Sequence, residues 1–551
     1  MSINEEIISM LKNAVISATT SGKIPEVGLL DIQLDYPKRP EYGNLSTNIA
    51  FLIAKKIKTS PYSAAQIIIE SMEKKEELIS KVEIAGAGFI NFWVLKERLY
   101  QVLKEIEDAD ESYGSSNLGQ GKRVLIDFVS ANPTGPLHVG HGRGADYGDI
   151  LANILAFCGY EVTREYYIND VGTQMKTLGE SLKVRYLQLL GQNVQLPDNG
   201  YKGEYLVEIA KTLFEQENDT CQDKDVLLSK EVEFFTKFAQ DKILEDIRKT
   251  LTDFGVHYDS WFSEKELYDS NQVDEAINSL KKSGFTYESE GALWFRSTSL
   301  GDEKDRVLIR QNGEHTYFAG DIAYHKSKYD RGYDVLINAW GTDHHGYVKR
   351  LESAMSALGY PANNLVFLLC QLVGLVRDNQ PVSMSTRAGE FVTLSELIKE
   401  VGKDVARFFF VMRKLNSHLE FDLTLAKQSS KENPVYYIQY VHARACSILS
   451  KANETSSADL NLLKLDEELT LIFKLASLPQ EIINCAKCYE PHGLTAYLIE
   501  LAGIFHNYYQ HHRVISANKE LTQSRLVLVN VVRIVIRNTL TLLGLTAPQR
   551  M

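Results

Sequence analysis

The sequence has few cysteines and no long apolar run, which excludes a protein built on a disulfide framework and a protein with a membrane-spanning helix. Six cysteines are scattered through 551 residues, too far apart to form a disulfide framework, so we expect the reducing cytoplasm as the compartment. No stretch approaches the roughly 20 apolar residues that a membrane-spanning helix needs. The opening segment, MSINEEIISMLKNAV, lacks the basic start of a secretory signal and is expected to form an amphipathic helix.

Basic residues are also scarce, but their distribution is uneven. The chain has 60 Lys and Arg against 72 Asp and Glu, a net charge of −12. Residues 431–551 carry +2, which leaves −14 on residues 1–430. From His511 onward, six basic residues stand against Glu520 alone. A locally basic C-terminal end is compatible with a nucleic-acid partner, and equally with a solvated helix face.

The length predicts two to four domains, because 551 residues exceed what one core holds. Residues 1–115 combine helical periodicity with a strand, VEIAGAGFINFWV, whose glycines predict a tight turn. The polar stretch Asp108–Lys122 is a candidate linker. Almost all of residues 426–551 has helical periodicity, most clearly RLVLVNVVRIVIRNTLTLLGL.

The middle segment, residues 116–425, alternates strands with helices. Val124–Ala131 predicts a buried strand, which a glycine-rich turn and a helix to about Cys158 follow. Further strands are expected at 160–168, 334–341 and 364–376, and together they predict a parallel, doubly wound, Rossmann-like sheet. Charged helical stretches at about 175–300 predict an insertion. The predicted fold class is therefore multidomain α/β, with an α+β N-terminal domain and an all-α C-terminal domain.

Two histidines follow the first strand of this sheet. His138 and His141 lie three residues apart at the start of the predicted helix, so their side chains share a face. This position combines the carboxyl end of a parallel strand with a helix N-terminus, where phosphates bind. Gly140 leaves space for a nucleotide, and imidazole donors stabilise charge on a departing pyrophosphate. The alternative is a pair of surface or zinc-binding histidines.

Two other nucleotide-binding motifs fail in this region. GQGKR at 119–123 lacks the Ser or Thr of a P-loop and precedes the strand. GHGRGADYG does not have the G-x-G-x-x-G spacing of a dinucleotide site.

The segment HVGH resembles the HIGH signature of class I aminoacyl-tRNA synthetases. The longer segment SANPTGPLHVGHGRG is similar to arginyl-tRNA synthetases in particular. Further segments resemble that family in order: GFINFWV its N-terminal domain, WGTDHHGYVKR its G-x-D-H segment, SMSTRAGEFVTL its KMSKS loop, and NPVYYIQYVHAR and LLGLTAPQRM its helical C-terminal domain.

The resemblance implies a two-step reaction. Arginine attacks the α-phosphate of Mg²⁺-ATP to give arginyl-adenylate, and the arginyl group then passes to the 2′-hydroxyl of the terminal tRNA adenosine. In this family, arginine activation generally needs bound tRNA. The resemblance also implies a cytoplasmic monomer, with an N-terminal domain at 1–115 that contacts the tRNA elbow and an anticodon-binding domain at 426–551.

The resemblance assigns ATP to residues at two strand ends. It implies that His138 and His141 stabilise the phosphates, with Gly140 leaving room for the nucleotide. Gly341 and Asp343 match positions that face the ribose, although an acid at this place can instead be a helix N-cap.

The KMSKS-like loop departs from the family pattern. Met384, Ser385 and Arg387 belong to the loop that closes over ATP, but it reads SMSTR and lacks both lysines. Arg387 is expected to supply one cation, and Lys349 or Arg350 another by position.

Arginine recognition requires acceptors, because a guanidinium only donates hydrogen bonds. The resemblance places Asp127, Tyr317 and Asp321 against the guanidinium. An acid inside the strand VLIDFVSA is costly to bury without a cation, which is either the substrate or a protein arginine. The other arginine-binding residues that the resemblance implies are Ser130 and Asn132, which hold the amino and carboxylate groups, and His345.

The resemblance also implies residues that contact tRNA. Tyr436, Tyr440 and Arg444 offer stacking surfaces and charge for splayed bases, although tyrosines at this spacing also pack helices together. Phe89 and Asn91 are expected at the tRNA elbow.

Three alternatives to an arginyl-tRNA synthetase remain. The first is a synthetase for another amino acid, the second is a small-molecule nucleotidyltransferase that also uses HxGH, and the third is a non-catalytic tRNA-binding paralogue that has lost the KMSKS lysines. The acids Asp127 and Asp321 favour arginine, and the C-terminal helices disfavour the nucleotidyltransferase.

Overall fold

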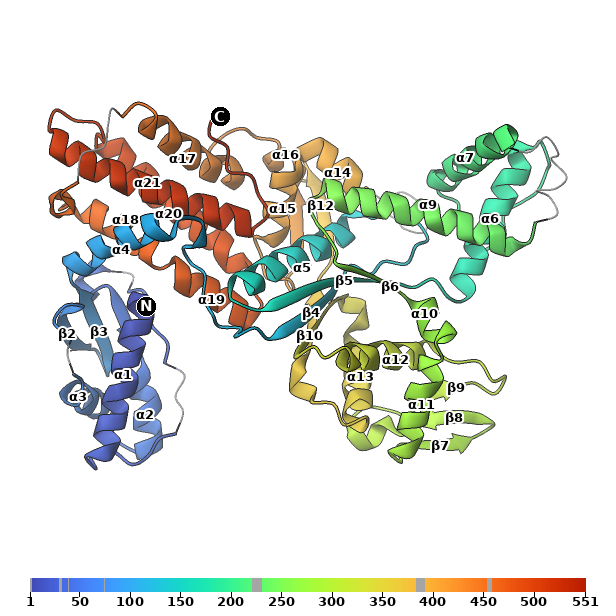
Figure 1. The fold of residues 1–551 in the computed structure, drawn as a ribbon, viewed down its shortest axis with the longest axis horizontal. Coiled ribbons are helices and arrows are strands. Elements are labelled where there is room, and N and C mark those ends of the chain that lie inside the picture. Colours follow the sequence, from blue (N-terminus) through green and yellow to red (C-terminus); the bar gives the residue numbers. More distant parts are fainter. Residues whose placement is uncertain are drawn as a thin grey trace.

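The computed structural model describes residues 2–28, 32–37, 39–73, 75–220, 230–382, 392–452 and 458–551. The molecule is elongated: a central sheet lies between a helical bundle formed by the C-terminal residues and a helical arm, and the N-terminal domain hangs from the bundle (Figure 1). No helix within these residues has the length and apolar character needed to cross a membrane.

The central sheet has five parallel strands in the order β11-β10-β4-β5-β6. The chain runs from β4 through β5 to β6 and then returns to β10 on the other side of β4, so the strand order reverses between β4 and β10. Ligands of such sheets bind at this reversal, beyond the carboxyl ends of the strands. The prediction of a Rossmann-like parallel sheet is confirmed. The bounds are β4 (Arg123–Phe128), β5 (Glu161–Ile168), β6 (Ser260–Ser263), β10 (Val335–Gly341) and β11 (Leu365–Cys370).

Helices cover this sheet and close its core. Helix α5 lies directly on β4, because Gly148 has no side chain where a Cβ would collide with the ring of Phe128. The helices of this region are α5 (Val139–Phe157), α10 (Glu264–Asp269), α11 (Gln272–Lys282), α12 (Tyr317–Asp330), α13 (His345–Ala357), α14 (Leu394–Val401), α15 (Lys403–Val411) and α16 (Leu423–Ala426).

Two strands differ from their predicted extents. Strand β4 ends at Phe128 because Val129 and Ser130 adopt positive φ angles of 67° and 41°, which turn the chain away from the sheet. The run predicted as one strand at 364–376 divides into β11 and β12 (Val373–Arg377), which belong to different sheets. Strand β12 lies between β13 (Gln380–Pro381) and β14 (Leu419–Asp422).

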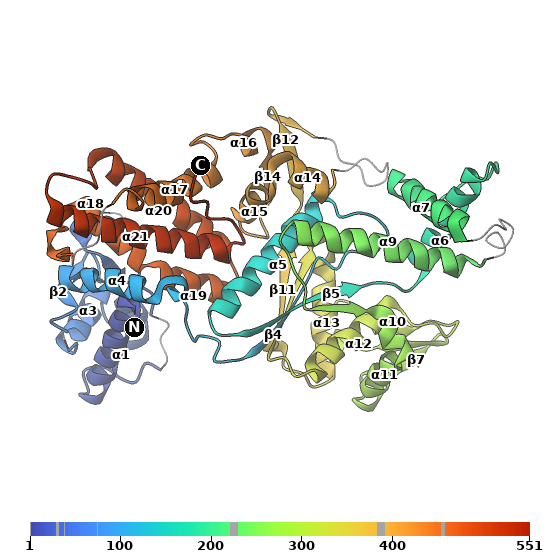
Figure 2. The same cartoon turned by 45° about the horizontal axis from the view of Figure 1, so that its top comes forward.

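The segment predicted as a single insertion at about 175–300 contains a strand of the central sheet, so that prediction was wrong in extent. Strand β6 pairs with β5 in parallel; its SWFS sequence is too short to show a strand period. Between β5 and β6 extends the arm (Figure 2), formed by α6 (Thr173–Leu189), α7 (Glu204–Thr220) and α9 (Val232–Asp253). Between β6 and β10 lies a small sheet of β7 (Thr286–Ser289), β8 (Ala292–Phe295) and β9 (Arg306–Ile309).

The N-terminal domain is a three-stranded sheet, ordered β1-β3-β2, with helices packed against it. The VEIAGAGFINFWV segment forms the β2–β3 hairpin, with an antiparallel register that pairs Ala85 with Phe89. The elements are α1 (Ile3–Thr20), β1 (Leu45–Thr47), α2 (Ile49–Ile57), α3 (Pro61–Glu70), β2 (Ile79–Ala85) and β3 (Phe89–Val94).

The segment expected to be a linker is packed against the C-terminal helices. It begins within α4 (Lys96–Ala109), where the Tyr100 hydroxyl donates to the carbonyl of Leu463 at 2.7 Å. The Tyr113 hydroxyl, also buried, donates to the carbonyl of Leu475. The C-terminal helices are α17 (Pro434–Leu449), α18 (Asp466–Ala476), α19 (Leu478–Cys488), α20 (His492–His511) and α21 (Lys519–Leu542).

Candidate active site

The two histidines of the HVGH segment (residues 138–141) begin helix α5 and cap it. The Nδ1 atom of His138 accepts from the Gly140 N–H at 3.1 Å, and Nδ1 of His141 accepts from the His138 N–H at 3.3 Å. The two rings stack with centroids 3.7 Å apart. Because each Nδ1 is an acceptor, a neutral ring carries its proton on Nε2. Burial lowers the pKa of both imidazoles, that of His141 to about 3, so both are neutral Nε2–H donors at physiological pH.

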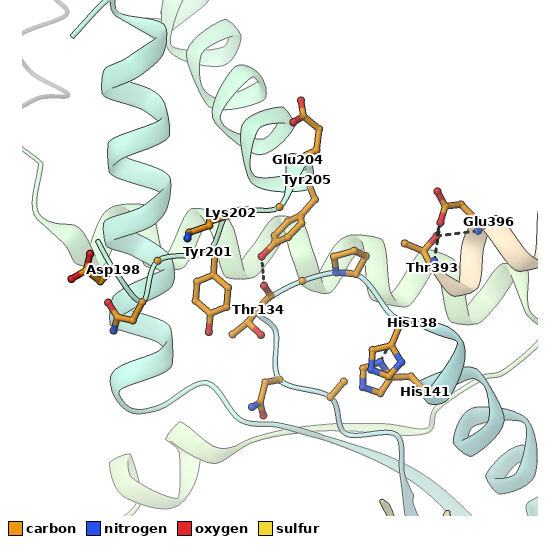
Figure 3. A pocket seen from close by; sticks show the side chains of 17 residues that line it. Thr134, His138, His141, Asp198, Tyr201, Lys202, Glu204, Tyr205, Thr393 and Glu396 are labelled. Atoms are coloured by element: carbon orange, nitrogen blue, oxygen red, sulfur yellow. Dashed lines mark hydrogen bonds between the residues drawn. The ribbon is translucent and has the colours of Figure 1, made fainter. Parts of the chain in front are cut away.

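Both histidines line a cavity of about 870 Å³ (Figure 3). The turn after β4 forms one wall, residues 198–205 of the arm form another, and Thr393 and Glu396 of α14 complete it. The Tyr205 hydroxyl donates to the carbonyl of Thr134 at 2.5 Å, which holds the arm against the turn. Lys202 is the cationic side chain among the described residues that line this cavity.

Residues 383–391 of the KMSKS-like segment, which include Met384, Ser385 and Arg387, lie outside the described residues. The end of this segment, residues 392–394, is bonded to the HVGH segment and the residue before it. The Val139 N–H donates to the carbonyl of Val392 at 3.3 Å, and the Leu394 N–H donates to that of Leu137 at 2.8 Å. The loop therefore rejoins the described chain beside the two histidines.

The structure places Lys349 and Arg350, the cations expected to replace the missing lysines, elsewhere. Lys349 forms an ion pair with Glu352 at 3.4 Å. The Arg350 guanidinium lies over the ring of Tyr347, 5.1 Å from its centroid. Neither side chain lines the cavity.

The end of β10 presents Gly341 and Asp343 beside the end of β4. A Cβ at Gly341 would meet the Asp343 carboxylate in its present position. The Asp343 side chain is 81% exposed. The N-cap of α13 is His344, which excludes the alternative that Asp343 caps this helix.

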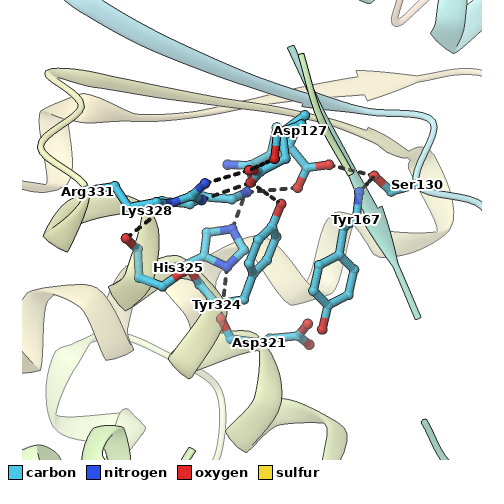
Figure 4. Close-up of polar contacts among 12 residues, drawn as sticks. Asp127, Ser130, Tyr167, Asp321, Tyr324, His325, Lys328 and Arg331 are labelled. Carbon is cyan, nitrogen blue, oxygen red and sulfur yellow. Dashed lines mark hydrogen bonds and ion pairs between the residues drawn. The ribbon is translucent and has the colours of Figure 1, made fainter. Parts of the chain in front are cut away.

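Asp127 forms a buried ion pair within the protein (Figure 4). Its Oδ2 lies 2.8 Å from Nζ of Lys328, a fully buried lysine that also donates to Asn338. Its Oδ1 accepts from the Ser130 hydroxyl at 2.6 Å, and the Ser130 oxygen accepts from the Tyr167 N–H. The burial of Asp127 is thus compensated by a protein cation, a lysine and not the arginine considered above, so burial no longer argues for a substrate contact.

A second buried ion pair adjoins the first. Glu165 accepts from the Arg331 guanidinium at 2.5 and 2.9 Å, and from the Tyr324 hydroxyl at 2.8 Å. Two carboxylates, Asp127 and Glu165, therefore face two cations, Lys328 and Arg331. This balanced group has no surplus negative charge for a further guanidinium.

The surplus negative charge lies at Asp321 and Glu264. Oδ2 of Asp321 accepts from the Tyr347 hydroxyl at 2.5 Å. Burial raises the pKa of Asp321 to about 6, and burial followed by the charge of Asp321 raises that of Glu264 to about 7. Glu264 is 3% exposed, and its Oε2 has no hydrogen-bond partner among the described residues. Two adjacent carboxyl groups, one buried and one partly buried, without a directly bonded cation form an environment suited to a guanidinium.

Sequence reasoning missed Glu264 and Tyr347. Glu264 starts α10 at the end of β6, inside the stretch taken for an insertion, and β6 was the only signal that could have located it. Tyr347 lies two residues after the predicted His345, which is exposed at the start of α13. Burial raises the pKa of Asp321, and the hydrogen bond from Tyr347, followed by the nearby His344, opposes this rise.

Tyr317 and Asn132 are two further residues expected to bind arginine. Tyr317 starts α12, one turn before Asp321, and its hydroxyl would lie 3.0 Å from a Cβ at Gly172. Asn132 lines the cavity and donates to Gln174 at 2.8 Å.

Aromatic rings and an arginine form a platform on α17 and α20. The rings of Tyr436 and Tyr440 are nearly parallel, with centroids 6.3 Å apart. The Arg444 guanidinium lies over the rings of Tyr440 and Tyr509. Arg444 lines two cavities, of about 600 and 340 Å³.

In the N-terminal domain, Phe89 and Asn91 differ in accessibility. Phe89 is 43% exposed and packs on Phe51. Asn91 is buried and accepts from the Ser46 hydroxyl at 2.7 Å. The expected contact of Asn91 with tRNA does not fit this burial.

Three family profiles match the chain. They are "Arginyl tRNA synthetase N terminal domain" over residues 2–94, "tRNA synthetases class I (R), catalytic domain" over residues 102–417, and "DALR anticodon binding domain" over residues 438–551. With the HVGH segment at the strand-order reversal of a parallel sheet, the fold and site define a class I aminoacyl-tRNA synthetase.

Similarity to individual proteins covers the whole chain. It is 47% identical over 556 residues to an arginine–tRNA ligase of Desulforamulus reducens, covering 100% of this chain and 99% of that protein. It is 48% identical to one of a Geobacter species, covering 97% of this chain and 96% of that protein. The Thermus thermophilus arginyl-tRNA synthetase structure has the same fold, with a TM-score of 0.79 at 23% identity, covering 98% of this chain and 99% of that one. The chain belongs to the arginyl-tRNA synthetase family.

Proposed function

We propose that this protein ligates L-arginine to the tRNA for arginine, with ATP converted to AMP and pyrophosphate. The observation that carries the choice of amino acid is the pair of Glu264, which is buried, and Asp321, which is partly buried; neither carboxyl group has a bonded cation among the described residues. A cationic side chain with a planar fork of donors complements such a pair.

ATP binds across the ends of β4 and β10. The Nε2–H groups of His138 and His141 donate to phosphate oxygens, and they stabilise the charge that develops as pyrophosphate leaves. Gly140 lets the nucleotide approach the backbone, while Gly341 and Asp343 face the ribose diol. Mg²⁺ enters with the ATP phosphates. Met384, Ser385 and Arg387 of the loop complete the ATP site.

Arginine binds beside the nucleotide with its guanidinium between Asp321 and Glu264. Tyr317 adds a hydroxyl acceptor one helical turn from Asp321. Asn132 and Ser130 hold the amino and carboxylate groups near the HVGH segment, and His345 borders the site. Asp127 acts indirectly, since its bond to the Ser130 hydroxyl orients that side chain.

The C-terminal platform binds splayed tRNA bases. Stacking on Tyr436 and Tyr440 tolerates several bases, and Arg444 adds charge and a donor fork. Phe89 offers an exposed ring to the tRNA elbow. We further propose that the protein acts as a cytoplasmic monomer, with domains at 1–115, 116–425 and 426–551.

The test is ATP–pyrophosphate exchange with each of the twenty amino acids, with and without tRNA. The proposal expects exchange with arginine alone, and expects tRNA to raise it. Exchange with a different amino acid would refute the arginine assignment. A protein that binds tRNA but exchanges with no amino acid would instead be a non-catalytic tRNA-binding protein.

A further inference from the structure

One buried guanidinium connects three parts of the molecule. Arg407, on α15, is fully buried. Its Nη2 donates to Asp149 of α5 at 2.6 Å, and its Nε lies 3.1 Å from Asp146 of the same helix. Through these two acids Arg407 is bonded to α5, the helix whose first turn carries the proposed ATP-binding histidines.

The Nη1 and Nε groups of Arg407 also donate to the ends of two other helices. Its Nη1 donates to the carbonyls of Phe254 and Gly255, both at 3.3 Å, where the arm helix α9 ends. Its Nε donates at 3.2 Å to the carbonyl of Leu543, the C-cap of α21. Carbonyls at helix ends lack intrahelical partners and carry partial negative charge, so a guanidinium there is well placed.

Arg407 packs closely against the end of α21, and a second residue of α5 also bonds to that end. Gly544 has a φ of +67°, and a Cβ there would lie 2.6 Å from Cζ of Arg407. Beside it, the Asn153 amide of α5 donates to the carbonyl of Leu542 at 3.2 Å. The end of the last helix of the C-terminal domain is therefore bonded to α5 both directly and through Arg407.

We infer that Arg407 is a positioning residue that couples tRNA binding at the C-terminal helices to the placement of His138 and His141. This inference rests on the proposed function. The fork of donors is required because five N–H groups in one plane serve three elements, whereas a lysine in the same place keeps the charge but has three donors on one atom.

The chain offers a matched control. Arg143 is equally buried and lies on α5, but it donates to the carbonyls of Gln371, Lys414 and Ser417, none of which belongs to the C-terminal helices. R143K therefore perturbs the same helix without touching its bond to α21.

The experiment is a double-mutant cycle in arginine-dependent ATP–pyrophosphate exchange at saturating tRNA. It combines R407K with R444A, a change on the platform that binds tRNA. Each single variant is expected to lower the exchange rate about 10-fold. The double variant is expected to match R407K within about 2-fold, because R407K already abolishes the contribution of tRNA binding to the rate and R444A cannot abolish it a second time. The cycle of R143K with R444A is expected to be multiplicative.

Multiplicative losses in the R407K cycle would overturn the inference, as would an unchanged rate in either single variant. N153A, which removes the neighbouring bond to Leu542, serves as a second variant should R407K melt below assay temperature; it too must be non-multiplicative with R444A. Wild-type protein that does not exchange with arginine would instead refute the proposed function.

Discussion

The Tyr347 hydroxyl of α13 donates a 2.5 Å hydrogen bond to Oδ2 of Asp321 on α12, beside the proposed arginine site. This bond orients a carboxylate that has no cation bonded to it among the described residues, so Asp321 is prepared for a ligand.

Replacing Asp321 with asparagine tests its contact with the guanidinium. A hydrogen bond to a charged group contributes about 1.5–3 kcal/mol. The KM for arginine in D321N should therefore rise roughly 10- to 100-fold, while the KM for ATP stays near the wild-type value. Y347F, which keeps the carboxylate, is expected to have a smaller effect. Equal increases in both KM values would contradict the assignment.

The pKa values of Asp321 and Glu264, about 6 and 7, predict a pH dependence of arginine binding. A cation binds the ionised carboxylates, so the Kd for arginine should fall as the pH rises from 5.5 to 7.5 and level off above. Protons should be released on binding, as calorimetry in two buffers of different ionisation enthalpy detects. In E264Q the portion of this dependence near pH 7 should disappear; a Kd independent of pH would exclude the acidic pair.

The histidines are expected to act as neutral donors. H138A and H141A should each lower the rate of adenylate formation by about 100-fold, as loss of a preorganised donor to a developing charge does. The exposed His257 provides a control, and H257A should be unaffected. Because the histidine pKa values are lowered by burial, the wild-type rate should not fall as the pH rises from 6 to 8. A decline with a midpoint near 6.5 would show that the charged form is required.

Lys202 is the candidate for part of the positive charge that the KMSKS-like loop lacks. An exposed charge contact contributes up to about 1 kcal/mol, so K202A should slow adenylate formation about 5-fold. K349A should not, because Lys349 pairs with Glu352 outside the cavity. Single-turnover adenylate formation distinguishes the two, and the reverse ranking would restore Lys349 to the role expected from its position.

Lys328 should be essential for stability because it neutralises Asp127. Removing one partner of a buried ion pair costs about 3–5 kcal/mol, and K328M should lower the free energy of unfolding by this amount. The double variant K328M/D127N should recover much of the loss. K326A, which breaks the more exposed pair with Asp330, should cost less than about 1 kcal/mol. Rescue of K328M by added arginine would mean that Asp127 faces the substrate after all.

Short-range patterns in the sequence determine only part of the proposed site. His138, Gly140 and His141 lie in one strand–turn–helix unit and were identified from that pattern, whereas Tyr317 and Asp321, one helical turn apart on α12, were assigned from the family resemblance. The partner of Asp127 is 201 residues away in the chain, and no periodicity predicts such a pairing. Glu264 was missed because its strand is four residues long.

Surface assignments were the least predictable, because exposure depends on tertiary packing. Phe89 and Asn91 belong to one strand and point to the same side by alternation. One is half-exposed, whereas the other is covered and bonded to Ser46.

The contacts of α4 attach the N-terminal domain to the C-terminal region. Arg98 of α4 binds Glu6 of α1 at 3.0 Å, while Tyr100 of the same helix and Tyr113 beyond its end bond to carbonyls of the C-terminal region. The N-terminal domain and the C-terminal helices are thus joined into one continuous unit. If the two domains contact the tRNA elbow and the anticodon as proposed, α4 fixes the distance between these two contacts.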